Sequence, residues 1–389
     1  MVFASDSNPL CAESYKANFD STEFVLAPIE DLDEEHLAPV LRQPVDLLAG
    51  GPPCPPFSKS RFYLPDKPRA LDDPLAAATL TGYLRVLKIV RPRAFLLENV
   101  PGLRYRVHGE ALRFLVSGAH KLGYETSTTV VNAADYGVPQ TRERLFMLGS
   151  LHGRVMMPSA THAASPEGAL PVGIRPWRTA GEVLCDLDTD EYDDLPGHAA
   201  GGQYHDLLKQ VPPGENYLFF TEERGHPQPQ FEWRSRYWSF LLKLSPDRPS
   251  WTIQARRSNN MGPFHWRNRI LRIEEVKRLQ SFPDGWLLSG GVSEQWRQLG
   301  NAVPPLLAEA IGRQLREHLT SVRDNGADGR VGRVAAARET VSRKVGTPQG
   351  RVPVNGRSGR LAGQCHREQT ADGDDGETGR STGKGETVR

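Results

Sequence analysis

Residues 45–58 read VDLLAGGPPCPPFS, a short apolar run that ends in a glycine pair and leads into a cysteine set among four prolines. The apolar run is typical of a strand buried in a parallel sheet. The prolines fix the backbone dihedrals on both sides of Cys54 and remove N–H donors, which favours a rigid loop that holds the thiol outward. The stretch therefore predicts a buried strand followed by a held, exposed nucleophile.

Strands and helices alternate on both sides of this stretch. Leucines at helical spacing predict a helix over residues 72–90, and a second helix is predicted over residues 111–123. Further strands are predicted at about residues 94–98, in ETSTTVVNAADYG (125–137) and in RLFMLGS (144–150). This alternation predicts the α/β class, with a parallel sheet that carries helices on both faces.

The chain divides into four parts by composition. Residues 1–150 are the first part of the α/β domain, and residues 151–245 are rich in Pro, Gly, Trp and Tyr, which predicts a smaller, loop-rich second lobe. Residues 246–320 become helical again and return to the first domain. Residues 321–389 lack apolar periodicity, so we expect a disordered tail.

Composition excludes several classes of protein. The formal net charge is +1, so any nucleic-acid surface must be local. The four cysteines form no CxxC pair and no Cys/His cluster, which argues against a zinc site or a disulfide framework and suits a reducing compartment. The chain shows no signal peptide and no long apolar run, so we expect a cytoplasmic protein that does not span a membrane.

Two reactive side chains follow neighbouring strands of the predicted sheet. Cys54 follows the first strand, and Glu98 and Asn99 end the strand AFLLENV. Ligands of open α/β sheets bind at these carboxyl ends. A carboxylate at the end of an apolar strand needs a partner or a raised pKa, and a thiolate with a carboxylic acid suits attack on an electron-poor ring. Taken singly, core packing explains Cys54 and a structural ion pair explains Glu98 about as well as catalysis does. Together, at adjacent strand ends, the two residues favour catalysis.

Basic residues point to a polyanionic partner. Arg142 and Arg144 precede a strand at a spacing that lets both guanidinium groups face one way, towards a phosphate or a carbonyl edge. Residues 224–272 contain ten Lys and Arg residues but only two acidic residues, Glu232 and Asp247. Four tryptophans lie in the same stretch. We favour nucleic acid over a solvated face here, since positive charge neutralises phosphates and aromatic rings stack on bases.

Several motifs together resemble the DNA (cytosine-5)-methyltransferase family. The resemblance runs from about residue 2 to residue 316. The matching segments are VFASDSNPLCAESYKANF (2–19), GGPPCPPFS (50–58), FLLENVPGL (95–103), QTRERLFMLGS (140–150), LSPDRPSWTI (244–253), RLQSFPDGW (278–286) and QLGNAVPPLLAEAI (298–311). It implies a Rossmann-like methyltransferase sheet, with residues 151–245 as a target-recognition lobe.

The resemblance also implies a mechanism. Cys54 adds to C6 of a cytosine flipped out of the duplex, and Glu98 protonates N3 or donates a hydrogen bond to it. Asn99 supports the Glu98 loop, while Arg144 and Arg142 hold the base carbonyl and the cysteine region. S-adenosylmethionine is the methyl donor, and no metal takes part.

Further site residues are carried over from the same motifs. Those implied for the cofactor are Asp6, Ile29, Pro53, Asn301, Ala302 and Val303. Those implied for DNA are Ser58, Ser60, Gln140, Arg256 and Arg257. The implied partners are double-stranded DNA and a cognate restriction endonuclease, for a monomer in the bacterial cytoplasm that associates with the nucleoid when it is bound to DNA.

The sequence departs from the family pattern at three places. No FxGxGG loop precedes the segment at residues 2–19, so two expectations stay open: the true start lies upstream of Met1, or the chain is an inactive fragment. PCPPFS replaces the commoner PCQPFS, for which we expect little loss. Pro28 stands where an acid usually contacts adenine, and Glu30 or Asp31 are the substitutes within reach.

Two alternative functions remain. A degenerate relative would bind DNA without methylating it. A tRNA cytosine-5 methyltransferase would share the chemistry of Cys54 and Glu98 but would normally lack so large a recognition insertion. An exocyclic-amine methyltransferase is disfavoured, because PPCPPFS is not a DPPY-like or NPPF-like loop.

Overall fold

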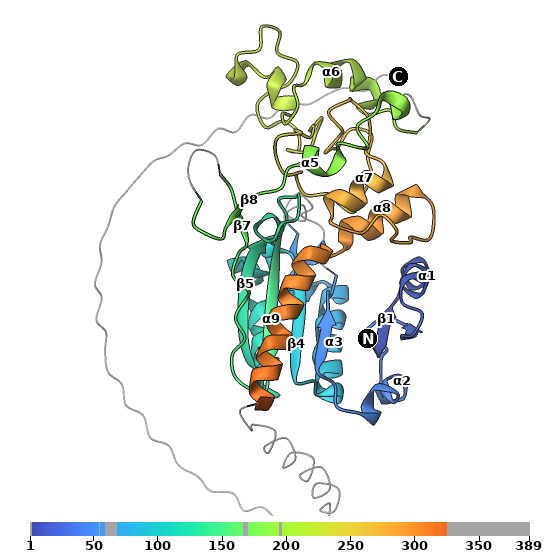
Figure 1. The fold of residues 1–389 in the computed structure, drawn as a ribbon, viewed down its shortest axis with the longest axis vertical. Coiled ribbons are helices and arrows are strands. Elements are labelled where there is room, and N and C mark those ends of the chain that lie inside the picture. Colours follow the sequence, from blue (N-terminus) through green and yellow to red (C-terminus); the bar gives the residue numbers. More distant parts are fainter. Residues whose placement is uncertain (1, 54, 59–67, 166–169, 194–196, 325–389) are drawn as a thin grey trace, which may run out of the picture. The chain divides into compact units, whose positions relative to one another are not determined.

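The computed structural model describes residues 2–53, 55–58, 68–165, 170–193 and 197–324 (Figure 1). Cys54 and Ser60 lie outside these residues, as does most of the expected tail. The α-helices are α1 (Pro9–Asn18), α2 (Glu34–Leu37), α3 (Pro74–Val90), α4 (Gly109–Lys121), α5 (Ala180–Leu184), α6 (His205–Gln210), α7 (Ile273–Leu279), α8 (Val292–Asn301) and α9 (Pro305–Asp324). The last helix thus continues a few residues into the segment expected to be a tail.

A four-stranded sheet forms the centre of the α/β domain. Its strands lie in the order β3 (Leu47–Gly50), β4 (Ala94–Asn99), β6 (Glu143–Ser150) and β5 (Glu125–Asn132). β3 and β4 are parallel, whereas β6 is antiparallel to both of its neighbours. The expectation of an all-parallel sheet is therefore wrong for β6. The connection from β5 to β6 holds only the 3-10 turn Ala133–Tyr136, which is too short for the crossover that a parallel pair needs.

Helices cover both faces of this sheet, because strand side chains alternate between the faces (Figure 1). On one face, residues of β4 and β6 pack against α3 and α4: Phe95, Leu97, Leu145 and Met147 against Leu80, Tyr83, Leu87 and Leu115. On the other face, Ala94, Phe146 and Leu148 pack against Leu307, Ile311 and Leu315 of α9. These two cores hold β4 rigidly, and Glu98 and Asn99 end that strand.

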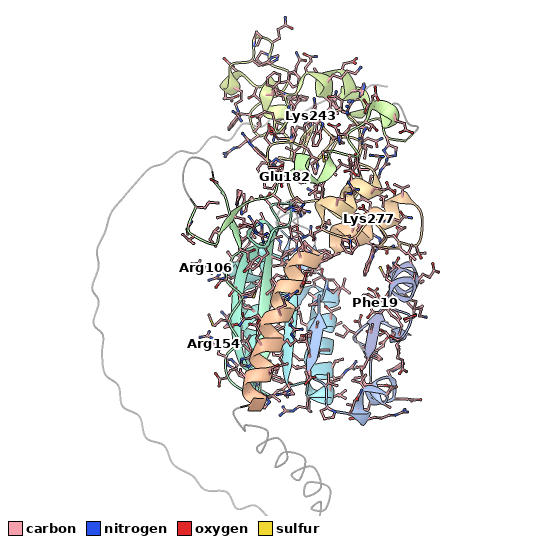
Figure 2. The ribbon with its side chains drawn as sticks, in the orientation of Figure 1. Phe19, Arg106, Arg154, Glu182, Lys243 and Lys277 are labelled. Carbon is pink, nitrogen blue, oxygen red and sulfur yellow. The ribbon has the colours of Figure 1, made fainter. Side chains whose placement is uncertain are left out.

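The first two strands form a separate parallel pair, β1 (Phe3–Asp6) and β2 (Glu23–Leu26). Among the described residues, no ladder of hydrogen bonds joins this pair to the four-stranded sheet. Helix α1 instead contacts α8, and Phe19, which follows α1, contacts the segment before α8. Ser14 Oγ donates to Gln298 Oε1 (2.6 Å), and Phe19 meets Trp286 edge to face with ring centroids 5.6 Å apart (Figure 2).

The second lobe is built mostly from irregular backbone. Between residues 151 and 245 it contains the two-residue strands β7 (His162–Ala163) and β8 (Arg175–Pro176) and two helices of at most six residues. One hydrophobic core runs from Ala180 in α5 to Leu299 in α8 and includes Leu208, Tyr217, Phe220, Phe240, Leu244, Phe264, Leu271, Val276 and Trp296. The core extends past residue 245. From here on, the second lobe means residues 151–245 together with the later residues, up to Leu299, that share this core.

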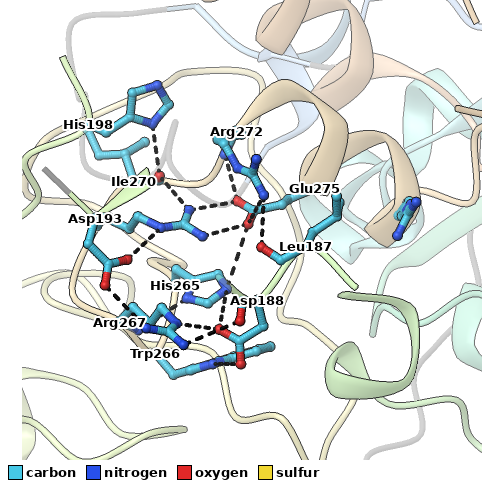
Figure 3. Close-up of polar contacts among 12 residues, drawn as sticks. Leu187, Asp188, Asp193, His198, His265, Trp266, Arg267, Ile270, Arg272 and Glu275 are labelled. Carbon is cyan, nitrogen blue, oxygen red and sulfur yellow. Dashed lines mark hydrogen bonds and ion pairs between the residues drawn. The ribbon is translucent and has the colours of Figure 1, made fainter. Parts of the chain in front are cut away.

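A buried network of charges ties the second lobe together (Figure 3). Glu275 is fully buried and accepts two hydrogen bonds from Arg269, at 2.9 and 2.7 Å, and two from Arg272. Burial opposes ionisation of Glu275, but these bonds and the nearby positive charges hold its pKa below the usual value. Arg269 and Arg267 also reach Asp193, so the network joins α7 to the segment around residue 190.

Replacing Glu275 with Gln should destabilise the protein by about 3–5 kcal/mol, because Arg269 would stay buried without its carboxylate. The measurement is the free energy of unfolding from urea titration. Glu309→Gln is the matched control, since Glu309 pairs with Arg313 at an exposed position of α9 and should change stability little. Equal effects of the two variants would contradict the assignment.

Candidate active site

Glu98 and Arg144 form an ion pair at the edge of the sheet where β4 ends and β6 begins. Arg144 Nε lies 3.0 Å from Glu98 Oε1, and both side chains are mostly buried. Burial raises the pKa of Glu98 above its usual value, and the positive charges of Arg144 and Arg142 only partly oppose the shift. A Cβ atom at Gly51 would lie 3.2 Å from Glu98 Oε2, so a glycine leaves room for this carboxylate beside the end of β3.

Asn99 connects the end of β4 to the loop that carries Cys54. Its side chain is fully buried, and Nδ2 donates to the Pro52 carbonyl at 3.1 Å. Its Oδ1 accepts from the Val100 N–H at 2.9 Å. Asn99 therefore fixes the backbone two residues before Cys54 relative to Glu98.

The other side of the Cys54 loop is anchored by Phe57. The 3-10 turn Pro55–Phe57 follows Cys54, and Phe57 is fully buried against the core beneath β4. The Phe57 ring meets the His108 ring edge to face. The Phe57 carbonyl oxygen approaches Gly102 so closely that a Cβ atom added to Gly102 would lie only 1.8 Å from it. The loop thus contacts the turn after β4 on both sides of Cys54. The Ser58 N–H donates to the Pro55 carbonyl at 3.2 Å, which makes Ser58 part of the same turn.

Arg142 and Arg144 have different partners, although the two residues are only two positions apart. Arg142 is fully buried, and its guanidinium donates to the carbonyls of Ile253 (3.0 Å), Gly300 (2.6 Å) and Ala302 (3.1 Å). Its geometry suits a positioning role rather than direct contact with a base. Arg144 forms the ion pair with Glu98, and the charge of Arg142 also lowers the pKa of that carboxyl.

Gln140, expected to contact DNA, is also fully buried. Its Nε2 donates to Leu279 O and Gln280 Oε1, and its Oε1 accepts from the Ile253 N–H at 3.0 Å. The side chain therefore joins the start of β6 to the second lobe.

The residues expected to bind the cofactor come from three segments. Asp6 is exposed at the carboxyl end of β1, and its Oδ1 accepts from the Asn8 N–H at 2.7 Å. Ile29 is half-buried beside α3, and Pro53 follows β3. The loop from Asn301 to Val303 follows α8, which is the helix that α1 contacts. An exposed acid after a strand suits a ribose diol, and a half-buried aliphatic side chain suits an adenine ring.

Arg256 is exposed, whereas Arg257 is half-buried and donates to the Gly197 carbonyl. Burial lowers the pKa of Arg257. No carboxylate pairs with either guanidinium in the part of the chain that the structure describes, so both charges are available to an anion.

Phe57 and Gly102 hold the site, but neither was among the residues predicted for it. One signal in the sequence could have pointed to Gly102: it follows Pro101 just after the strand that carries Glu98, and a glycine there can mark a close approach of another backbone segment. The partner of that approach, 45 positions earlier in the chain, could be found only in the structure.

Gly102→Ala should lower the free energy of unfolding by about 1–3 kcal/mol, because the new methyl group collides with the Phe57 carbonyl. It should also change the rate at which an alkylating reagent modifies Cys54. Gly312→Ala is the control: Gly312 is exposed on α9 with no atom within 4 Å of an added Cβ, so the substitution should be neutral or slightly stabilising. An unchanged alkylation rate in Gly102→Ala would show that Phe57 does not set the Cys54 loop.

The described residues contain no group of three or more His, Cys, Asp or Glu side chains that could hold a metal ion. None of the described helices is both long enough and apolar enough to cross a membrane.

Comparison with known proteins identifies the family. The model of the C-5 cytosine-specific DNA methylase family matches residues 1–317. The chain is 37% identical over 337 residues to the type II methyltransferase M.SacI of Streptomyces achromogenes, covering 82% of this chain and 84% of that protein. It is 28% identical to the type II methyltransferase M1.HphI of Haemophilus parahaemolyticus, with 80% and 79% covered.

Solved structures agree on the fold. A candidate DNA modification methyltransferase encoded within an E. coli prophage superimposes with a TM-score of 0.57 at 20% identity, covering 82% of this chain and 93% of that one. The match to the family model over most of the chain, with the closely related sequence from Streptomyces, shows that the protein belongs to the C-5 cytosine-specific DNA methylase family.

Proposed function

We propose that the protein methylates C5 of a cytosine flipped out of double-stranded DNA, through a covalent adduct with Cys54. The observation that carries the proposal is the shared sheet edge. There Asn99 bonds to Pro52 beside Cys54, and Glu98, with a raised pKa, lies next to Gly51 and Arg144. A carboxylic acid is thereby held next to the loop of a proline-framed thiol.

The reaction follows from these positions. The Cys54 thiolate forms a bond to C6, and protonated Glu98 gives its proton to N3, so the electron pair of the broken double bond is left on C5. S-adenosylmethionine, when bound, supplies an electrophilic methyl group to C5. Water then takes the C5 proton, and the electron pair of that C–H bond re-forms the C5–C6 double bond and expels the Cys54 thiolate, while N3 returns its proton to Glu98. Arg144 orients Glu98 throughout.

Three parts of the chain would hold the cofactor. Asp6 would accept hydrogen bonds from the ribose hydroxyl groups, Ile29 would pack on the adenine, and Pro53 with the loop from Asn301 to Val303 would line the rest of the pocket. Isothermal titration of the chain with S-adenosylmethionine tests this. Asp6→Asn should weaken binding, whereas no binding by the unaltered chain would favour the degenerate DNA-binding alternative.

The biological setting is inferred from the relatives. The relatives are type II methyltransferases, and on this basis we infer a restriction-modification setting, with a cognate restriction endonuclease as the functional partner and a monomer as the acting form. Ser58 and Ser60 would follow the DNA backbone beside the cysteine loop. Arg256 and Arg257 would meet phosphates, since no described carboxylate neutralises them.

Cys54→Ser should abolish the covalent complex with duplex DNA that carries 5-fluorocytosine, because the oxygen nucleophile is far weaker than a thiolate. The measurement is a band that resists denaturation on a gel, formed with S-adenosylmethionine present. Cys185→Ser is the control, because Cys185 is an exposed free cysteine away from the sheet edge, and it should leave the band unchanged. A band that persists in Cys54→Ser would remove the nucleophile assignment, and a band formed with tRNA instead of DNA would favour the tRNA alternative.

Methyl transfer should slow as pH rises through the pKa of Glu98, because only the protonated carboxyl can donate to N3. Since burial raises that pKa, the loss should begin at a higher pH than for an ordinary glutamate. Glu98→Gln should be about 10²- to 10⁴-fold slower and should lack this part of the pH profile. A profile of the same shape for both proteins would contradict the role of Glu98 as the acid.

A further inference from the structure

The cations of the second lobe fall into two groups. Arg267, Arg269 and Arg272 belong to the buried network with Asp188, Asp193 and Glu275. Arg224 pairs with Glu215, and Lys243 is buried against backbone carbonyls, where burial lowers its pKa to about 8 (Figure 2). Within the described ranges, the arginines of residues 224–272 that no carboxylate neutralises are Arg234, Arg236, Arg248, Arg256 and Arg257. Four of the ten cations in residues 224–272 are therefore paired with carboxylates inside the lobe.

Two of these arginines lie in a segment with unusual exposure. All seven residues from 232 to 238, EWRSRYW, are exposed, including Trp233, Tyr237 and Trp238. We call residues 232–238 the aromatic segment. Three large aromatic rings in water are unfavourable for a monomer unless they meet a partner. The arginines among them make a purely apolar partner unsuitable, and they favour a polyanion with flat rings.

The aromatic segment is held in shape although it is exposed. The Tyr217 hydroxyl donates to the Arg236 carbonyl (2.9 Å), and Asn216 Nδ2 donates to the Trp238 carbonyl (2.8 Å). A turn closes between Ser235 and Glu232, and Arg234 adopts a φ of 57°, which is a costly backbone state for a residue other than glycine. Both ends are fixed in the core by Phe231 and Phe240, whose rings lie 5.6 Å apart. Such a segment loses little entropy when it binds.

The end of the aromatic segment lies near the edge that carries the candidate active site. Trp238 meets Trp251 edge to face, with ring centroids 5.6 Å apart. The neighbour of Trp251, Ser250, accepts from the Thr141 N–H at 2.8 Å, and Thr141 precedes Arg144 by three residues. A duplex that delivers a cytosine to Glu98 would therefore pass close to this pair of tryptophans.

We propose that the aromatic segment reads the DNA sequence, with Arg234 and Arg236 donating to guanine edges in the major groove and Trp238 contacting the adjoining strand. The inference rests on the proposed function in taking duplex DNA as the partner. A guanidinium fits the O6 and N7 atoms of guanine with two parallel hydrogen bonds from a rigid fork, whereas the ammonium of a lysine is a point charge on a flexible stem and holds these atoms with less directional specificity. The held backbone sets the spacing between the two guanidinium groups, and hence which base pairs they reach.

The test is selection of binding sites from a duplex library of random sequence, using the full chain. The unaltered protein should select one consensus. Arg234→Ala and Arg236→Ala should each lose discrimination at one guanine position by about 5- to 150-fold, with the other positions kept. Arg234→Lys keeps the charge and the salt dependence but should lose the same discrimination. Arg313→Ala is the control: Arg313 is at an exposed position of α9, and this variant should select the original consensus.

Each outcome decides the proposal. An unchanged consensus in the Arg234 and Arg236 variants, or no consensus for the unaltered protein, would overturn it. Melting temperatures equal to that of the unaltered protein exclude misfolding as the cause of a change. Because selection by binding needs neither Cys54 nor methyl transfer, a shifted consensus supports this inference even where the methylation assay fails. If the unaltered protein methylates DNA but the Arg234 and Arg236 variants select the same consensus as it does, this inference is overturned and the proposed function is kept.

Discussion

The guanidinium of Arg142 joins the three regions on which the candidate site depends. Its bonds to the carbonyls of Ile253, Gly300 and Ala302 bring together the start of β6, a segment of the second lobe and the loop after α8. All three acceptors are main-chain atoms, so the contact fixes backbone positions rather than side-chain rotamers. A buried arginine needs such acceptors to offset the loss of water. The expected cofactor loop, the expected base-binding edge and the lobe expected to recognise DNA thereby share one rigid junction.

The candidate site gains its reactivity from the same rigidity. Asn99 and Phe57 hold the Cys54 loop on either side, and Gly51 and Gly102 allow two backbones and a carboxylate to approach closely. The resulting burial disfavours the charged form of Glu98, while Arg144 keeps the carboxyl oriented. Protonation of a ring nitrogen requires an acid with a raised pKa that is also fixed in direction, and burial and Arg144 supply these two properties to Glu98.

Local pattern was sufficient for the strands and for the acid and thiol at their ends, because an apolar run with one polar end has few other interpretations. It could not separate Arg142 from Arg144, since their different environments come from carbonyls more than 100 residues away. The antiparallel direction of β6 was not predicted, because the sequence of a strand does not show its direction. The short connection between β5 and β6 does indicate an antiparallel pair. The charge of the second lobe was overestimated for a similar reason: the acids that neutralise Arg267 and Arg269 include Asp188 and Asp193, which come from a different stretch of the chain.

The separation of the β1–β2 pair from the larger sheet has a consequence for dynamics. This pair, with α1, is attached through side chains, by Ser14 and Phe19 to the region of α8 and by an apolar cluster to α3. In the described part of the chain, its movement away from the larger sheet breaks no ladder of backbone hydrogen bonds. The pair can therefore open as a unit of its own, at a lower free energy than the cores around β4. Asp6 moves with that unit. A ligand that contacts both Asp6 and the loop after α8 would therefore stabilise the closed arrangement of the β1–β2 pair against α8.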